Sequence, residues 1–115
     1  MFKADDYRLR IKSLEETLGE AKYALDIDNR YAQLKELKAE QEKPEVWQDL
    51  ERSAKIGREI SSTENKIAAY EKGRKALDDA MEIIDLIEET GEEDLVGELD
   101  GMMSAAEKDI EEMRI

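Results

Sequence analysis

Apolar residues recur at alternating steps of four and three along most of this chain, with charged residues between them. Such spacing lines up on one face of a helix and is typical of coiled-coil packing. Near the N-terminus it predicts a first helix over approximately residues 3–24. The apolar positions of this helix are Tyr7, Ile11, Leu14, Leu18, Ala21 and Leu25.

The polar stretch Asp-Ile-Asp-Asn at 26–29 interrupts the first pattern. Short Asp and Asn side chains accept hydrogen bonds from the free amides at helix starts, so the chain can begin a new helix here. We expect this second helix over approximately residues 27–42. Its apolar positions are Leu34, Leu37 and either Ile27 or Tyr31.

The only proline and the only tryptophan lie together in Lys-Pro-Glu-Val-Trp, residues 43–47. Pro44 lacks an amide hydrogen and disfavours helical geometry at Lys43, so the second helix should end there. Pro44, Val46 and Trp47 then form a structural corner, a short turn whose side chains fold back onto the helices. We expect the Trp47 ring to fill this corner, which is a packing role.

The most regular pattern covers residues 56–84 and predicts one long helix over approximately residues 50–89. Its nine positions lie along one face of the helix, which we call the 56–84 seam. Seven of them are apolar, namely Ile56, Ile60, Ile67, Tyr70, Leu77, Met81 and Ile84. Thr63 and Arg74 are the exceptions. Gly57 and Gly73 are interpreted as tolerated flaws, and Gly91 is expected to end the helix.

A fourth helix, antiparallel to the third, is predicted over approximately residues 92–114. Its apolar positions are Leu95, Leu99, Met102, Ala106, Ile110 and Met113. The predicted fold is all-α: a single helical domain, 1–115, built as an elongated antiparallel helical hairpin or coiled coil with two shorter N-terminal helices packed at one end. The helical pattern runs to the last residue without a cap, which fits a longer natural polypeptide as well as a short one.

The charge balance excludes several classes of partner. There are 31 acidic and 18 basic residues, for a net charge of −13. Such a surface is repelled by phosphate, so we expect neither direct nucleic-acid binding nor binding to anionic membranes. The N-terminus has no apolar signal core, and no apolar run is long enough to cross a membrane. These features predict a cytoplasmic protein.

No set of residues predicts catalysis, so this chain is not expected to be an enzyme by itself. It has no cysteine and no histidine, which excludes disulfides, thiolate metal sites and the usual nucleophile–base pairs. We expect no cofactor. The acidic run 88–94 lacks the alternating ligand positions of a calcium-binding loop. We therefore interpret it as a solvent-exposed charged segment in preference to a metal site.

Two groups have both a structural and a functional interpretation. Lys72, Arg74 and Lys75 cluster on or beside the seam of the long helix and are candidate partner contacts. Alternatively, Arg74 extends into solvent near the thin end of the hairpin. Met102 and Met103 fit an adaptable docking surface, but their helical spacing favours ordinary core packing.

The segment 25–67 resembles the N-terminal domain of the bacterial peptide chain release factor 2 family. That family has Leu-Asp near the start of the second helix, matched by Leu25 and Asp26. Its corner reads [KQ]-P-[DE]-[VF]-W and is matched by residues 43–47. A following small–Gly/Ser–[KR]-E pattern is matched within Lys-Ile-Gly-Arg-Glu at 55–59. Beyond residue 68 the likeness is mainly one of helical pattern.

The resemblance implies a ribosome-associated domain of a stop-codon-dependent termination factor. Such domains reach the GTPase-associated region of the large subunit near the stalk-base protein, and they influence cooperation with the GTPase release factor. The family reads stop codons with Ser-Pro-Phe and releases peptides with Gly-Gly-Gln, and neither tripeptide occurs here. The resemblance therefore implies no peptide release by this chain alone. Two alternatives remain: a self-associating coiled-coil adaptor pairing through the 56–84 seam, and a metal-binding regulator using 88–94.

Overall fold

A computed structural model describes residues 1–114, and these residues form five helices with no strand among them. The helices are α1 (Ala4–Ala24), α2 (Ile27–Gln41), α3 (Pro44–Trp47), α4 (Leu50–Thr90) and α5 (Asp94–Glu112). The predicted all-α class is confirmed. Four of these helices begin and end within two residues of the bounds that the periodicity predicts, and α3 is a single helical turn within the predicted corner.

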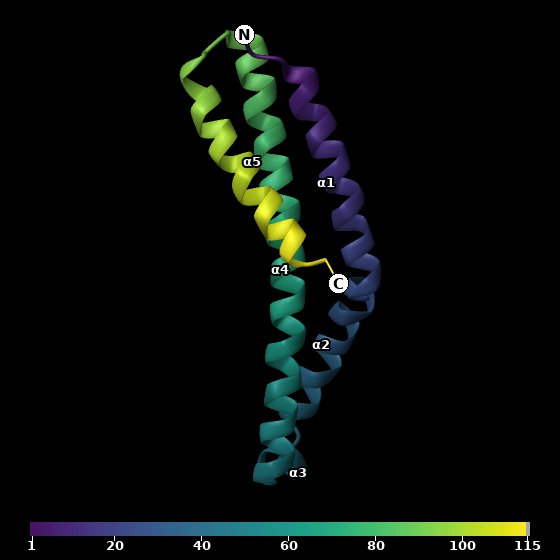
Figure 1. Cartoon of the computed structure of the whole chain (residues 1–115). Coiled ribbons are helices and arrows are strands. Elements are labelled where there is room, and N and C mark those ends of the chain that lie inside the picture. The colour runs from purple at the N-terminus through teal and green to yellow at the C-terminus, as the bar shows by residue number, and fades with distance from the viewer. Residues whose placement is uncertain (115) are drawn as a thin grey trace.

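The described chain is a rod that measures 64 × 24 × 18 Å. Helix α4 has 41 residues, which at about 1.5 Å per residue accounts for nearly the whole long axis. Helix α5 turns back antiparallel along the C-terminal half of α4, as Figure 1 shows. The predicted elongated antiparallel hairpin is therefore confirmed.

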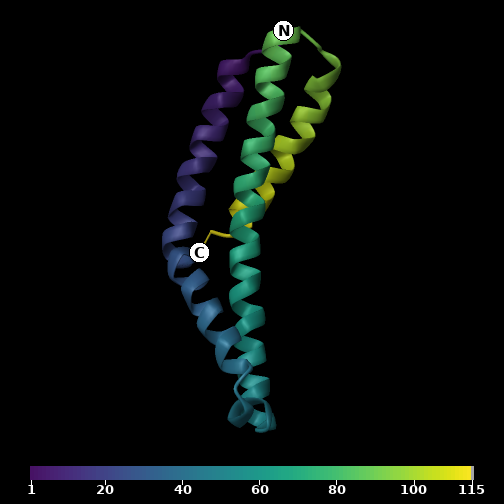
Figure 2. The same ribbon diagram turned by 180° about the vertical axis from the view of Figure 1, so that it is seen from behind.

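The two N-terminal helices are arranged differently from the expectation that both pack at one end. They follow one another along α4, with α1 beside the half that α5 also covers and α2 beside the other half (Figures 1 and 2). The physical reason is length, because α1 and α2 have 21 and 15 residues and together nearly match α4. One half of the rod thus has three helices, and the other half has two helices and the short α3.

Capping residues explain where α4 begins and ends. The Asp49 carboxylate accepts a hydrogen bond from the Arg52 amide at 3.2 Å, which satisfies one free donor of the first turn. At the other end Gly91 has φ +70°, in the left-handed region, and its amide donates to the Ile87 carbonyl oxygen. Glycine accepts this conformation without steric cost, so the predicted helix end at Gly91 is confirmed.

The core has two parts that correspond to the two halves of the rod. In the three-helix half, Leu18, Leu77, Ile84, Leu99 and Ile110 belong to one buried cluster from α1, α4 and α5. In the other half, a smaller cluster from α2, α3 and α4 contains Leu37, Val46, Ile56 and Ile60. No helix within residues 1–114 is long and apolar enough to span a membrane.

Burial decides between the alternatives that periodicity left open. Ile27 is fully buried, whereas 46% of Tyr31 is exposed, so Ile27 occupies the apolar position of α2. Met103 is fully buried while Met102 is only half-buried at the core's edge. Thr63 is 1% exposed, so this exception in the seam still faces the inside of the rod.

The break between α1 and α2 lies where the polar stretch predicts it, but the expected capping bond is not formed. Asp26 has φ 55° and ψ 46°, a left-handed conformation unusual for a residue with a side chain. Its carboxylate accepts hydrogen bonds from the Asn29 side-chain amide at 2.8 and 3.0 Å rather than from a backbone amide. The Arg30 side chain donates to the Leu25 carbonyl oxygen at 3.0 Å. Side chains at 29 and 30 therefore stabilise the bend.

Gly73 is not merely a tolerated flaw in α4. A Cβ atom there would lie 2.9 Å from Met113 Cε, 3.2 Å from Leu18 Cδ1 and 3.3 Å from Ile110 Cγ1. The absence of a side chain therefore lets α1 and α5 approach α4 closely at the same level. By contrast, only Gln41 Nε2, at 4.0 Å, lies near the corresponding position of Gly57.

Candidate functional site

The corner at Pro44 forms as predicted, but Val46 fills it instead of Trp47. Pro44 is the first residue of α3, and Lys43 before it is extended, with φ −72° and ψ 133°. Val46 is fully buried, whereas 52% of Trp47 is exposed. Neighbouring residues of a helical turn point about 100° apart, so Trp47 is turned outward when Val46 faces α2 and α4. The expectation that the tryptophan ring plugs the corner is wrong.

The outward turn of Trp47 leaves apolar surface at this end of the rod. Leu50, the first residue of α4, is 83% exposed. Pro44 is also exposed. The corner therefore combines a buried packing residue with accessible apolar side chains.

The three candidate partner contacts lie near the middle of α4, beside Gly73, and not at a tip of the rod. The Arg74 guanidinium donates to Glu15 of α1 at 3.1 Å and to Asp78 at 2.8 Å. Only 33% of its side chain is exposed. Arg74 thus links α1 to α4, and the expectation that it extends into solvent near a thin end is wrong.

Lys72 and Lys75 are much more accessible than Arg74, with 72% and 76% of their side chains exposed. The Lys72 ammonium lies 3.4 Å from the carboxylate of Asp109 on α5. The Lys75 ammonium lies 2.6 Å from the carboxylate of Asp79 one turn later, and this hydrogen bond raises the pKa of Lys75. Both side chains are largely exposed and an ammonium has three donors, so each lysine can contact a partner beside its own carboxylate.

These two lysines border a groove of about 300 Å³ between α4 and α5. Its apolar lining comes from Ala76 of α4 and from Met102 and Ala105 of α5. The sequence pattern did not single out the two alanines, since each lies outside the core stripe. Of the two methionines that fit a docking surface, Met102 lies on this groove, whereas Met103 packs in the core.

The net charge is concentrated in the hairpin that α5 forms with the end of α4. Residues 77–114 hold 15 of the acidic residues but only two of the basic residues. Residues 1–76 hold equal numbers of each sign, so the segment 77–114 carries the entire net charge of −13. One part of the rod is therefore strongly acidic, and the rest is balanced.

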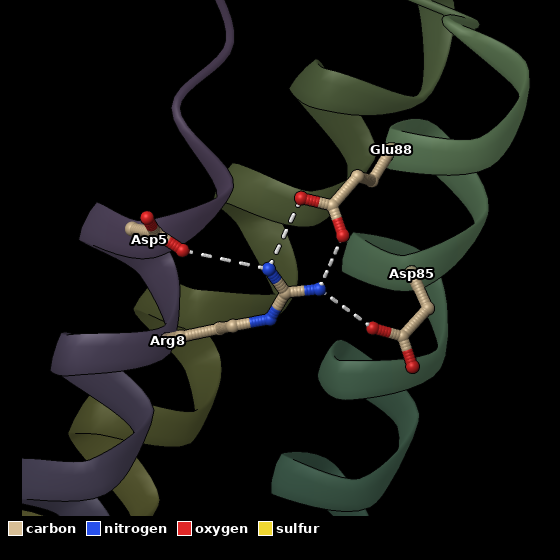
Figure 3. Close-up of polar contacts among 4 residues, drawn as sticks. All are labelled: Asp5, Arg8, Asp85 and Glu88. Atoms are coloured by element: carbon tan, nitrogen blue, oxygen red, sulfur yellow. Dashed lines mark hydrogen bonds and ion pairs between the residues drawn. The ribbon is translucent and has the colours of Figure 1, made fainter.

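A salt-bridge network joins α1 to this acidic hairpin (Figure 3). The Arg8 guanidinium donates to both carboxylate oxygens of Glu88, at 2.8 and 3.1 Å, and to Asp85 at 2.9 Å. Asp5 lies 3.6 Å away on the same helix as Arg8. The hydrogen bond from Arg8 lowers the pKa of Glu88, because it favours the ionised carboxylate. This arrangement is a structural link between helices.

Further polar contacts place α1 on one flank of α5. The Tyr7 hydroxyl donates to Asp100, and the Arg10 guanidinium donates to Glu107 at 2.6 Å. The hydrogen bond to Asp100 raises the pKa of Tyr7. In the segment 88–94, Glu88 binds Arg8. Within the described part of the chain, no three acidic side chains converge in a way that suits a metal ion.

The sequence profile of the PCRF domain matches residues 30–115, three quarters of the chain. The chain belongs to the PCRF domain family. Peptide chain release factor 2 of Mycolicibacterium smegmatis is 29% identical over 110 residues. The aligned region covers 96% of this chain and 30% of that protein, so the chain spans less than a third of its relative's length.

The matches confirm the resemblance to release factors, which rested on the motif at Lys43–Trp47. Both the corner and the whole of α4 lie inside the matched region of the PCRF domain. The seam residues of α4 and the residues that line the groove between α4 and α5 therefore all lie within the matched region. Helix α1 precedes the matched region, and it reaches the PCRF domain through Arg8, Arg10 and Tyr7.

Proposed function

We propose that this PCRF domain is the ribosome-associated helical part of a stop-codon-dependent translation termination factor. The observation that supports this proposal is the family match over residues 30–115, together with the release factor 2 relative that aligns with 96% of the chain. The proposed docking place is the GTPase-associated region of the large subunit, through the stalk-base protein. The domain would also influence the GTPase release factor from there.

The charge distribution supports contact with protein in preference to ribosomal RNA. The acidic hairpin of residues 77–114 repels phosphate, whereas it attracts basic protein surfaces and speeds their approach. The chain contains neither Ser-Pro-Phe nor Gly-Gly-Gln. In this proposal the domain positions a termination factor, and codon reading and peptide release reside in other parts of the factor.

Lys72 and Lys75 are the proposed partner contacts on this domain. Both are exposed, and both border the α4–α5 groove. Arg74 completes the predicted set, but its bonds to Glu15 and Asp78 give it a supporting role. It holds α1 against α4 beside the two lysines.

The alternative of a self-associating coiled coil is less well supported. It requires the 56–84 seam of α4 to pair with another chain. In the structure Ile56, Ile60, Ile67, Leu77 and Ile84 of that seam are buried against helices of the same chain. Pairing between chains would have to displace those helices.

Co-sedimentation with bacterial ribosomes tests the proposal. The chain is expected to pellet with complete ribosomes and to remain in the supernatant with ribosomes that lack the stalk-base protein. Equal pelleting with both would refute docking through that protein, and no pelleting with either would refute docking by this domain alone. Sedimentation equilibrium on the same sample measures its mass, and a stable dimer would favour the coiled-coil alternative.

A charge-reversal variant tests the proposed contact. Lys72→Glu with Lys75→Glu should weaken pelleting while leaving the helical circular dichroism unchanged. The matched control is Lys12→Glu with Lys35→Glu, which changes the same charge at exposed positions of α1 and α2. Equal weakening by both pairs would mean that net charge, and not this site, governs binding.

A further inference from the structure

The α4–α5 pair has one flank covered by α1 and an opposite flank that is open. Asp85 and Glu88 of α4 and Asp100 and Glu107 of α5 contact α1. Helical geometry places Ala76 and Ala105 on the other side of the pair. Within residues 1–114 no helix lies along that side (Figures 1 and 2).

The open flank has the shape that a helix needs. The groove of about 300 Å³ is shallow and mainly apolar, because two alanines and Met102 line it where larger side chains would fill it. Along α4, Ile83 and Leu86 continue the same face at helical spacing, and 41% of Leu86 is exposed. Small side chains beside a flexible methionine are typical of grooves that receive an apolar helix face.

The charges around the groove determine which helix would fit. Lys72 and Lys75 line the end nearest the middle of the rod, together with their ion-pair partners Asp109, at 3.4 Å, and Asp79, at 2.6 Å. Each ammonium has three donors, so each lysine can bind a further acceptor beside its own carboxylate. Farther along, Glu82 and Glu98 are exposed on the adjoining turns, within the segment that carries the whole net charge. A symmetric dimer through this groove would bring two acidic hairpins together, so that mode of self-association is electrostatically disfavoured.

We propose that the α4–α5 groove binds an amphipathic helix of another protein, with small apolar side chains in the groove and lysine or arginine along its flanks. An acidic residue of that helix would lie beside Lys72 and Lys75. Completing the groove would turn the three-helix half of the rod into a four-helix bundle. The inference deepens the proposed partner contact at these lysines and rests on it, since it states the chemistry of the partner.

The test uses a synthetic helix and no ribosome, so its result is separate from that of co-sedimentation. The probe is a 16-residue peptide with alanine and leucine on one face, lysine on its flanks and two glutamates at one end. The full chain is titrated with the labelled peptide, and binding is followed by fluorescence anisotropy. A second peptide has the same composition in an order that spreads the apolar residues around the helix.

A pair of neutral substitutions localises the binding. Ala105→Gln fills the groove without changing charge, whereas Ala32→Gln makes the same change on the exposed surface of α2. The dissociation constant should rise about tenfold with Ala105→Gln and less than about twofold with Ala32→Gln. Glu98→Lys should weaken binding more than Glu36→Lys, an exposed position of α2.

Three results would overturn the proposal. Equal effects of the two glutamine variants would place the peptide elsewhere on the acidic surface. Equal binding of the reordered peptide would show that charge alone attracts it. Dimerisation of the chain that Ala105→Gln abolishes would identify a second copy as the occupant of the groove.

Discussion

Replacing Gly73 by alanine tests whether the close approach of three helices depends on the missing side chain. The new methyl group would lie 2.9 Å from Met113 Cε, a flexible chain end that can move aside. It would also lie 3.2 Å from Leu18 Cδ1 and 3.3 Å from Ile110 Cγ1, and both of those residues are buried. The buried contacts therefore decide the outcome.

Two opposing effects set the magnitude. Alanine favours the helix over glycine by about 1 kcal/mol. Inserting a methyl group into a well-packed core costs about 1–3 kcal/mol when neighbours must shift. Because Leu18 and Ile110 come from two different helices that would both have to retreat, we expect the packing cost to prevail. The free energy of unfolding should fall by about 1 kcal/mol.

Gly97→Ala is the matched control, because nothing lies within 4 Å of the corresponding Cβ position on α5. It should raise the free energy of unfolding by about 1 kcal/mol through helix propensity alone. Both variants are measured by urea unfolding followed at the helical circular-dichroism band. If Gly73→Ala stabilised the protein as much as Gly97→Ala does, the close approach at Gly73 would be refuted.

The remaining predictions concern the corner, the bend and the salt-bridge network. Val46→Ala should lower the free energy of unfolding in urea by about 2 kcal/mol, and Trp47→Ala should lower it by less than about 1 kcal/mol, because only the valine is buried. A larger loss with Trp47→Ala would mean that the tryptophan ring, and not Val46, fills the corner. Asp26→Val should cost about 2 kcal/mol while Asp26→Gly is tolerated, because a branched side chain opposes the left-handed conformation. Equal free energies of unfolding for those two variants would contradict the left-handed conformation at Asp26. The pKa of Glu88 is lowered, so its pairing with Arg8 stabilises the fold above the ordinary glutamate range and is lost as the pH falls through the lowered value. The difference in melting temperature between the unmodified chain and Glu88→Gln should therefore shrink on acidification, and a constant difference would contradict the pairing.

Much of this fold was predictable because a helix with one buried face requires apolar residues at regular, short spacing in the sequence. The four-and-three spacing identifies each buried face, since every helical turn repeats the same geometry. Gly91 and Pro44 mark helix boundaries for equally local reasons, a left-handed φ and a missing amide donor. The Lys43–Trp47 corner also carried the family resemblance that the PCRF match confirms.

The tertiary structure decided what local spacing leaves open. Periodicity gives no means to tell which of Val46 and Trp47 faces inward, because both belong to one short turn. Periodicity also presents Gly73 as a flaw in the helix. The neighbours that approach α4 at Gly73 are Leu18 and Ile110, which belong to helices distant in sequence. The groove between α4 and α5 likewise exists only because those helices pack with α1 on one flank. Local patterns thus determined the helices and their faces, whereas the pairing of distant faces determined which surfaces are left for a partner.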